Sequence, residues 1–413
     1  MAGSISEEQF EKDALAFLQA NAKPRAEIRR QWGEGSDKVS LFPERTPEED
    51  RADLEAARRW AQNRFDAGFG WITGPEQYGG RNLGRSFQRI YDRLESSFEI
   101  PSQAVFGIGL GMIAPTILAH AIEEVKQKYL RSLYRGDIVA CQLFSEPSAG
   151  SDLASLQTKA MRDGDEWIIN GQKVWTSGAH LSDIGEIICR TDPSVEKHRG
   201  LTGFVVDMHA PGVEVRPLRQ MTGGASFNEV FFTDVRVPDS HRLGDVNQGW
   251  TVALTTLMNE RAAIGGGSGG SGLGALGTWR LIEIVKKMGK SSDPLIRQDL
   301  AQVIISTKVA SYTNLRAMSK LAAGQLPGPE MSIAKLSLTQ NFTRMCNLLS
   351  EVLGMKIIAD TGEWGTYAWS EFLLSVPGMR IAGGTDEVMH NIVGERVLGL
   401  PKEPKVPSTT SFE

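Results

Sequence analysis

The sequence predicts an α+β protein whose first and last thirds are helical and whose middle third consists of short strands. Two observations support this prediction. Apolar residues recur at helical spacing near both ends of the chain, and between them short apolar runs alternate with turn signals at intervals of roughly ten residues. We place an N-terminal helical domain at 1–137, a middle β-barrel or sandwich domain at 138–243, a C-terminal four-helix bundle at 244–400 and an extended or disordered tail at 401–413.

The helices of the N-terminal part are predicted from their capping residues. Ser6–Gln9 and Thr46–Glu49 both have the capping-box pattern, in which a hydroxyl and a carboxylate or amide three residues later satisfy the first backbone N–H groups. The second box opens a helix that we expect to run to Asp66. A further helix is predicted over Glu123–Tyr134, with Gly136 as its stop.

The strands of the middle part are predicted from alternating and β-branched residues between turn signals. Asp163–Asp165 and Asn170–Gly171 have the composition of hairpin turns. Further strands are expected over Ile184–Arg190, Gly203–Met208, Val213–Pro217 and Glu229–Val237.

The C-terminal part returns to helical spacing, as in a helix bundle. The predicted helices are Gly249–Ala263, Asp293–Ala323, Ser332–Met355 and Thr385–Leu398. Glycine-rich segments interrupt them at 265–277 and 381–385. The first of these is either a flexible break or a device that leaves room for a bulky ligand.

Composition excludes several classes of function. The 413 residues carry a formal net charge of −5, so there is no basic surface for nucleic acid. Cys141, Cys189 and Cys346 are too few and too far apart for a disulfide framework or a zinc site, and none of the six histidines has metal-ligand spacing. We therefore expect a cytoplasmic protein without a metal.

No membrane segment or signal peptide is predicted. The first residues lack a basic region followed by an apolar stretch. The longest apolar run, Ala104–Ala119, contains glycines and a proline and is shorter than the ~18 residues of a membrane span. We interpret it as a buried helix.

Two short segments have the composition of a ligand site. In Leu143–Asp152, small residues leave backbone N–H groups and hydroxyls accessible to a polar ligand. In Asn170–Ser177, a tryptophan followed by hydroxyls could stack on an aromatic cofactor and hydrogen-bond its edge. Taken alone, the first segment is better explained as a surface turn and the second as a core tryptophan in a hairpin.

Together with two later segments, these motifs resemble the acyl-CoA dehydrogenase family over nearly the whole chain. SEPSAGSD at 145–152 is similar to that family's flavin-binding loop, and GQKVWTS at 171–177 to the strand beside its flavin ring. FNEVFFTDVRVP at 227–238, followed by LG and GW, is similar to the end of its β domain. IAGGTDEVMHNIVGERVLGL at 381–400 is similar to its C-terminal helix. The helix–strand–helix order of the domains is also the family's order.

The resemblance implies FAD as the cofactor. It places Trp175 against the flavin ring and the hydroxyl of Ser177 near flavin N5. It assigns Thr385 and Glu387 to the adenosine half of the cofactor. The implied cofactor-binding residues are Gln142, Phe144, Ser145, Gly150, Ser151, Trp175, Ser177, Gly354, Gly384, Thr385 and Glu387.

The resemblance also implies the catalytic base. Many members carry it as the Glu of a Glu-Gly-Thr triplet, which here reads Gly383–Thr385. A minority, including isovaleryl-CoA dehydrogenases, place the Glu before an Arg on an early helix of the C-terminal domain, and here that position is Glu260, before Arg261. The absence of the triplet Glu and the presence of Glu260 at the alternative position support the same assignment of the base. A solvated helix face is the competing interpretation of Glu260 and Arg261.

The implied activity is α,β-dehydrogenation of an acyl-CoA thioester to the trans-2-enoyl-CoA. Glu260 would remove the α-proton while flavin N5 accepts hydride from the β-carbon. The backbone N–H of Gly383 would stabilise the developing enolate. Ser151, Arg261 and Gly383 are the implied substrate-binding residues. An electron-transfer flavoprotein or similar acceptor would reoxidise the FAD, in fatty acid or lipid catabolism.

Two departures from the family pattern leave alternatives open. The Arg-x-x-Phe-Gly motif, whose Arg binds FAD pyrophosphate in a neighbouring subunit, is absent after Trp279, and a usual Gln is Glu351 here. Lys286, Lys287 or Lys290 are candidates to replace that Arg. We expect a homo-oligomer, a dimer or tetramer, with a hetero-oligomer as the alternative. The competing functions are a non-catalytic partner subunit of a hetero-oligomeric enzyme and a flavin oxidase or monooxygenase on the same fold.

Overall fold

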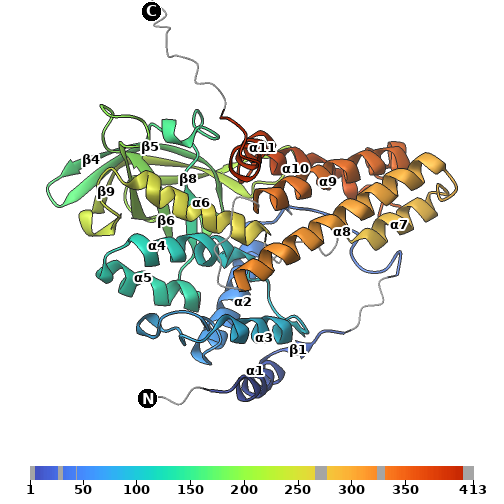
Figure 1. The fold of residues 1–413 in the computed structure, drawn as a ribbon, viewed down its shortest axis with the longest axis horizontal. Helices are drawn as coiled ribbons and strands as arrows, with labels where there is room; N and C mark the ends of the chain where they lie inside the picture. Colours follow the sequence, from blue (N-terminus) through green and yellow to red (C-terminus); the bar gives the residue numbers. More distant parts are fainter. Residues whose placement is uncertain (1–4, 27–30, 43, 266–276, 323–330, 403–413) are drawn as a thin grey trace, which may run out of the picture.

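The computed structural model describes residues 5–26, 31–42, 44–265, 277–322 and 331–402. Side chains at the edges of these gaps, Arg261 among them, lie outside the description. Figure 1 shows a β domain beside long C-terminal helices, with the N-terminal helices below both. The glycine-rich run at 266–276 and the tail after 402 lie outside the described residues.

The N-terminal domain is helical, as predicted. Its elements are α1 (Glu7–Asn21), β1 (Lys23–Pro24), α2 (Pro47–Asp66), α3 (Arg85–Glu95), β2 (Phe98–Glu99), α4 (Ala114–His120) and α5 (Glu123–Arg135). The capping box at Thr46 is present, with both reciprocal hydrogen bonds to Glu49. Ser6 makes only half of its predicted box, because the side chain of Gln9 bonds Asp13 instead.

Helix termini and the apolar run also agree with the expectations. Gly136 ends α5 in a left-handed conformation, at φ +81°. The run from Ala104 is helical rather than membrane-spanning: a 3₁₀ turn and a π-helix (Gly109–Ile113) lead into α4. No helix among the described residues is long and apolar enough to span a bilayer.

The middle domain is an eight-stranded sheet whose described strands do not close into a barrel. The strands are β3 (Ala140–Leu143), β4 (Lys159–Asp163), β5 (Glu166–Ser177), β6 (Ile184–Arg190), β7 (Leu201–Asp207), β8 (Val213–Leu218), β9 (Phe227–Pro238) and β10 (Arg242–Leu243). Their order is β10-β7-β6-β4-β5-β9-β8, with β3 paired to β6. A single residue pair, Lys159 with Arg190, joins β4 to β6, so the sheet divides there into two portions. The portions pack together, as the rings of Trp167 and Phe204 show at 5.3 Å.

One predicted turn is wrong. Asn170–Gly171 lies inside β5, where the register against β9 shifts by a β-bulge. The side chain of Asn170 bonds both the backbone N–H and the carboxylate of Asp234 across the strands. A Cβ at Gly171, which has φ +152°, would meet Thr158 Oγ1 at 2.5 Å. The unusual backbone that Asn-Gly favours is therefore used for a bulge and not for a hairpin.

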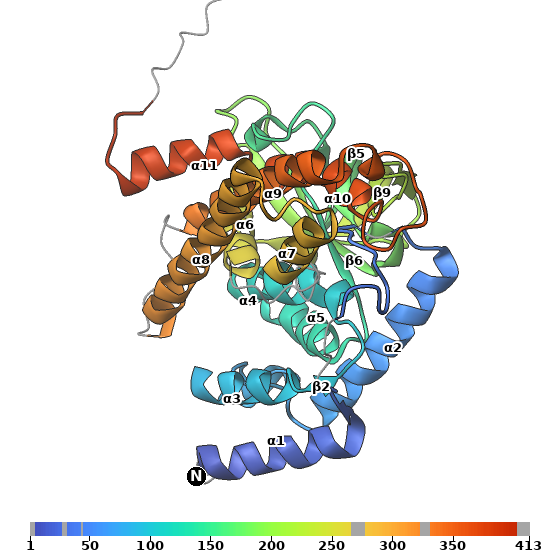
Figure 2. The same ribbon diagram turned by 90° about the vertical axis from the view of Figure 1, so that its right-hand side faces the viewer.

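The C-terminal domain contains the predicted helices and two more. Its helices are α6 (Gly249–Gly265), α7 (Thr278–Lys287), α8 (Pro294–Ala322), α9 (Met331–Leu353), α10 (Trp369–Ile381) and α11 (Asp386–Ile392). Figure 2 shows α7, α8, α9 and α10 gathered as a bundle, with α6 close to the β domain. The predicted helix 385–398 is α11 continued by a π-helix, Val393–Val397.

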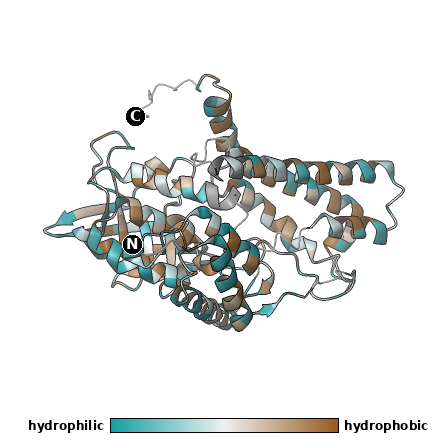
Figure 3. Ribbon diagram, turned by 60° about the horizontal axis from the view of Figure 1, so that its bottom comes forward, coloured by the Kyte–Doolittle hydropathy of each residue, from teal (hydrophilic) through white to brown (hydrophobic). Residues whose placement is uncertain are grey.

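Apolar side chains are not confined to the interior of this domain. Figure 3 shows hydrophobic and hydrophilic residues mixed along the long C-terminal helices. On α8, Ile305, Val309 and Tyr312 share one helical face, and each is more than half exposed. An apolar row of this kind is typical of a surface that another protein covers.

Candidate active site

The loop after β3 is fixed by a buried ion pair. Lys173 of β5 is fully buried, and its ammonium donates to Glu146 at 2.9 Å and to the carbonyl of Phe144 at 3.0 Å. The carboxylate of Glu146 also accepts from the backbone N–H groups of Gln157 and Thr158, at 2.6 and 2.9 Å. Burial alone would raise the pKa of Glu146, but the Lys173 charge and these hydrogen bonds lower it. One carboxylate therefore closes the loop and ties it to β5.

This arrangement brings the two predicted flavin segments together. The backbone N–H of Val174 donates to the carbonyl of Ser145 at 2.8 Å, so the loop begins alongside the end of β5. Gln142 lies just before it on β3. Trp175 follows at a β-bulge, with φ +62° and 57% of its surface exposed. A large aromatic residue in a rare backbone conformation and open to solvent is poorly explained by folding alone.

The hydroxyls here are available to a ligand. Within the described part of the chain, those of Ser145, Ser151 and Ser177 make no hydrogen bond, and Oγ1 of Thr176 is buried without a partner. An exposed indole beside several unengaged hydroxyls fits an aromatic cofactor with a polar edge, as FAD has. Phe144 is buried, whereas Gly150 is exposed at the tip of the loop.

Glu260 lies near the end of the described part of α6. Its side chain is partly buried and has an interaction within the structure, so it is not a purely solvated group. The helix packs against the π-helix, α4 and β7. Its anchors include Thr255, which hydrogen-bonds His120 at 2.8 Å, and Thr256, which bonds Thr116 and Glu186.

The start of α11 is also fixed by hydrogen bonds. Gly383 and Gly384 have φ +66° and +88°, and Thr385 caps the helix by accepting from the N–H of Val388. Asp386 bonds Lys335, Thr339 and Arg380. Burial opposes these contacts, but together they lower the pKa of the Asp386 carboxyl. Glu387, one residue on, is exposed.

Gly354 is not brought to the other cofactor residues. It follows the C-terminal end of α9, whereas Thr339, which bonds Asp386, lies near the N-terminal half. The intervening residues span about 20 Å at 1.5 Å per residue. Glu351 is exposed on the last turn of α9. Within one chain, Gly354 therefore stands apart from the segment that contains Thr385.

The candidate substitutes for the missing Arg differ in availability. Lys286 pairs with Glu283 at 2.8 Å, whereas Lys287 and Lys290 are exposed. Arg280 is buried, donates to the carbonyl of Asp37 and lies over Trp364, so it is engaged elsewhere.

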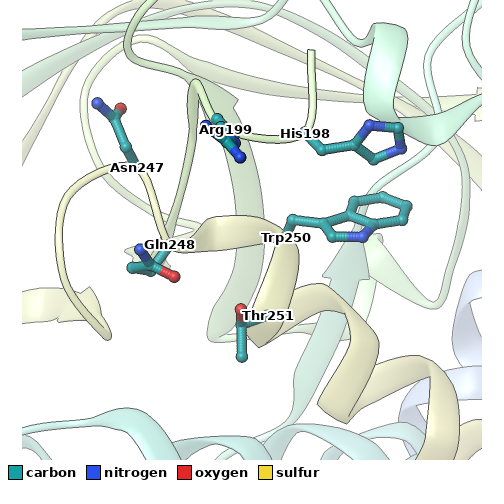
Figure 4. Close-up of a pocket in the computed structure, with 6 residues that line it drawn as sticks. All are labelled: His198, Arg199, Asn247, Gln248, Trp250 and Thr251. Atoms are coloured by element: carbon teal, nitrogen blue, oxygen red, sulfur yellow. The ribbon is translucent and has the colours of Figure 1, made fainter. Parts of the chain in front are cut away.

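A pocket at the start of α6 was missed by the sequence analysis. It has a volume of about 510 Å³ and is lined by His198, Arg199, Asn247, Gln248, Trp250 and Thr251 (Figure 4). The rings of His198 and Trp250 stand edge to face at 4.7 Å. Arg199 adds a positive charge. Two rings and a cation suit a flat heterocycle that carries phosphate.

The pocket is connected to the flavin-binding loop. Lys197, next to His198, forms an ion pair with Asp152 at 2.7 Å, and Asp152 directly follows Ser151. The only sequence signal was the Gly249–Trp250 pair, because the other half of the pocket lies some fifty residues earlier. The loop, the pocket and α6 thus form one continuous region.

Comparison with known proteins identifies the family. The N-terminal, middle and C-terminal domain models of acyl-CoA dehydrogenases match residues 5–137, 141–235 and 247–398. The chain therefore belongs to the acyl-CoA dehydrogenase family and is an acyl-CoA dehydrogenase enzyme, with the family's fold and FAD as cofactor.

Mycobacterial relatives are similar over most of the chain. Acyl-CoA dehydrogenase IpdE1 of Mycobacterium tuberculosis is 35% identical over 364 residues, which cover 85% of this chain and 90% of that protein. Acyl-CoA dehydrogenase FadE34 of the same organism is 42% identical over 290 residues, which cover 70% of this chain but only 39% of that longer protein.

Solved structures agree on the fold and include two-component complexes. The Tcur3481-Tcur3483 steroid ACAD has a TM-score of 0.72 at 26% identity and covers 96% of this chain and 98% of its own. The ChsE4-ChsE5 complex from Mycobacterium tuberculosis has a TM-score of 0.69 at 25% identity, and the match covers 98% of this chain and 100% of that chain.

Proposed function

We propose that this enzyme converts an acyl-CoA thioester to the trans-2-enoyl-CoA, with Glu260 as the base that removes the α-proton. The observation that supports this most is the course of α6. The helix begins at the pocket, with Trp250, and reaches Glu260 ten residues later, about 15 Å along its axis. A ligand whose nucleotide end occupies the pocket can extend along α6 to a reacting carbon beside Glu260.

The other side chains would hold and polarise this ligand. His198 and Trp250 would contact the adenine of CoA and Arg199 a phosphate, while Ser151 lies on the loop nearest the pocket. The backbone N–H of Gly383 would stabilise the enolate that forms as the proton leaves. Ser145, Trp175, Ser177 and the α11 start would hold the FAD, which supplies the hydride acceptor.

We further propose a bulky acyl group as the substrate. The Tcur3481-Tcur3483 protein is named a steroid ACAD, and its sequence is 26% identical to this chain. The sequence supports the same idea, because the run at 265–277, most of which lies outside the described residues, is rich in glycine. An electron-transfer flavoprotein would accept the electrons.

Product analysis tests this function. The purified enzyme is incubated with an artificial electron acceptor and, separately, with butyryl-CoA, isovaleryl-CoA and a cyclohexane-carboxyl-CoA thioester. We expect products two hydrogen atoms lighter, with a higher kcat/KM for the ring-containing thioester. Products that contain oxygen from O₂ would instead support a monooxygenase, and turnover with O₂ as the sole acceptor that releases hydrogen peroxide would support an oxidase. No product would support a non-catalytic subunit.

The second candidate function is a subunit of a two-component complex. The Tcur3481-Tcur3483 steroid ACAD and the ChsE4-ChsE5 complex are each named for two proteins, and Glu351 replaces a usual Gln here. A carboxylate near FAD pyrophosphate would repel it. Measuring FAD per chain in the purified protein decides between the candidates, since an enzyme complete in itself binds one FAD per chain.

A further inference from the structure

A fully buried glutamate lies at the junction of the three domains. Glu186 is on β6, and its neighbours across the sheet are Gln142 of β3 and Val205 of β7. Its Oε1 lies 2.6 Å from the hydroxyl of Thr256 on α6. Thr256 Oγ1 in turn lies 2.8 Å from Thr116 Oγ1 on α4. A chain of polar groups therefore runs from the sheet through α6 to the N-terminal domain.

Counting protons along this chain favours a protonated Glu186. The hydroxyl of Thr116 also lies 2.8 Å from the carbonyl of Met112, which can only accept, so Thr116 donates there. Thr256 Oγ1 also lies 3.3 Å from the carbonyl of Val252, so its single proton has three acceptors within reach. A proton on Glu186 lets all three short contacts, at 2.6, 2.8 and 2.8 Å, be hydrogen bonds, with Glu186 donating to Thr256, Thr256 to Thr116 and Thr116 to Met112. A carboxylate that accepts from Thr256 leaves one of these short contacts without a proton.

The surroundings agree with a neutral acid. Burial raises the pKa of Glu186 to about 8. No charge contributes to this shift. Its other oxygen, Oε2, is buried and accepts no hydrogen bond from the described residues, which suits a carboxylic acid better than a carboxylate.

The titratable groups on the elements packed around Glu186 are few. On α4, His120 bonds Thr255, and burial and the charge of Lys126 lower its pKa, so it is neutral above pH 7. On α6, Glu260 lies one helical turn beyond Thr256. Cys189 lies on β6 itself, and burial raises the pKa of its thiol. Glu186 is thus the group expected to change charge near pH 8.

We propose that Glu186 acts as a protonated positioning residue that donates a hydrogen bond to Thr256. This bond fixes the position of α6 on the sheet and thereby places Glu260 against the substrate. The effect on catalysis that this inference predicts rests on the proposed role of Glu260 as the base. Glu260 is four positions after Thr256, about 6 Å along the helix, so a shift at one residue is transmitted to the other.

The protonation state is tested directly by infrared difference spectroscopy, which requires neither substrate nor activity. The spectrum of wild type minus Glu186→Gln should contain the carbonyl stretch of a protonated carboxylic acid at pH 6.5, and the band should disappear by pH 10. A band that is absent at pH 6.5 would overturn the protonated assignment.

The positioning role is tested by comparing Glu186→Gln with Glu186→Met. The Gln amide still donates to Thr256, whereas Met has a similar length and cannot. With isovaleryl-CoA as the probe, we expect Glu186→Gln to retain kcat within about threefold. Glu186→Met should lower kcat on the order of 10–100-fold at similar KM, since small misplacements of a catalytic group have such effects. Hydrogen exchange of the α6 amides should rise in Met only.

The pH profile separates positioning from packing. Wild-type kcat should fall above about pH 8, as Glu186 loses its proton and its donor role, and Glu186→Gln should not show this fall. If Glu186→Met and Glu186→Gln have the same kcat and the same amide exchange, the positioning role is wrong. This holds even if replacing Glu260 abolishes turnover. If both variants lose all flavin reduction while Glu260→Gln retains it, the proposed base is wrong and the Glu186 result stands by itself.

Discussion

At the residue scale, a buried charge pair controls the shape of the candidate cofactor site. Lys173 and Glu146 are both nearly inaccessible, and between them they hold Phe144, Gln157 and Thr158 through backbone groups. Such pairs add little net stability compared with an apolar core, but breaking one leaves an uncompensated buried charge. Their value here is geometric, because the same two side chains fix both the loop and the strand that carries Trp175.

Lys173→Met is therefore expected to destabilise the protein by about 3–5 kcal/mol and to weaken FAD binding. Thermal unfolding and FAD dissociation, followed by flavin fluorescence, measure the two effects. Lys173→Met combined with Glu146→Gln should recover part of the lost stability, because no buried charge remains. Equal melting temperatures of the single and double variants would contradict this explanation.

The same pair gives a pH dependence of known sign. The pKa of Glu146 is lower in the folded protein than in the unfolded chain, so its stabilising contribution is present above the unfolded value near 4.5 and is lost as pH falls through the folded value. Acid unfolding of wild type should therefore be steeper below pH 4.5 than that of the double variant.

At the element scale, most helices and strands were predictable because their periodicity and caps agree with their tertiary environment. β6 has the predicted bounds, Ile184–Arg190, and α2 begins at its capping box. α10 was missed. It contains Pro377 and apolar residues on several sides, so neither the spacing nor the termini indicated a helix. Asn170–Gly171 was misassigned because a bulge and a hairpin favour the same residues.

The exposed apolar face of α8 is expected to be a subunit interface. Ile305, Val309 and Tyr312 follow helical spacing, and obligate interfaces bury such faces. Val309→Glu should reduce the oligomeric mass measured by light scattering, while Met161→Glu, at an exposed apolar site on β4, should not. An unchanged mass for Val309→Glu, with the wild type oligomeric, would place the interface elsewhere.

At the scale of the whole molecule, the site is assembled from the middle and C-terminal parts of the chain. The sequence indicated the flavin loop, the Trp175 strand and the α11 start because each is a local motif. It did not indicate the pocket at His198 and Trp250, since those residues meet only after the middle domain packs on α6. Glu186 was also missed, because its significance lies in burial and in a contact with a helix seventy residues later.

The pocket's role in binding CoA is tested with Arg199→Ala. Arg199 is largely exposed, so its contact with a phosphate should contribute about 1 kcal/mol, or roughly fivefold in Kd. Isothermal titration with free CoA should show this loss and a weaker dependence on salt. Binding of a pantetheine thioester, which lacks the nucleotide, should be unchanged. A loss that is equal for both ligands would mean that Arg199 acts on folding and not on the nucleotide.

The central claim is that Glu260 removes the α-proton. Its most direct test is the single-turnover reduction of bound flavin, followed by absorbance without oxygen, after mixing with isovaleryl-CoA. Glu260→Gln should retain FAD and the wild-type melting temperature yet reduce flavin about 10²–10⁴-fold more slowly, since the amide cannot accept a proton. Glu214→Gln, on exposed β8, is the matched control and should react like the wild type. Flavin reduction at the wild-type rate in Glu260→Gln would contradict the account.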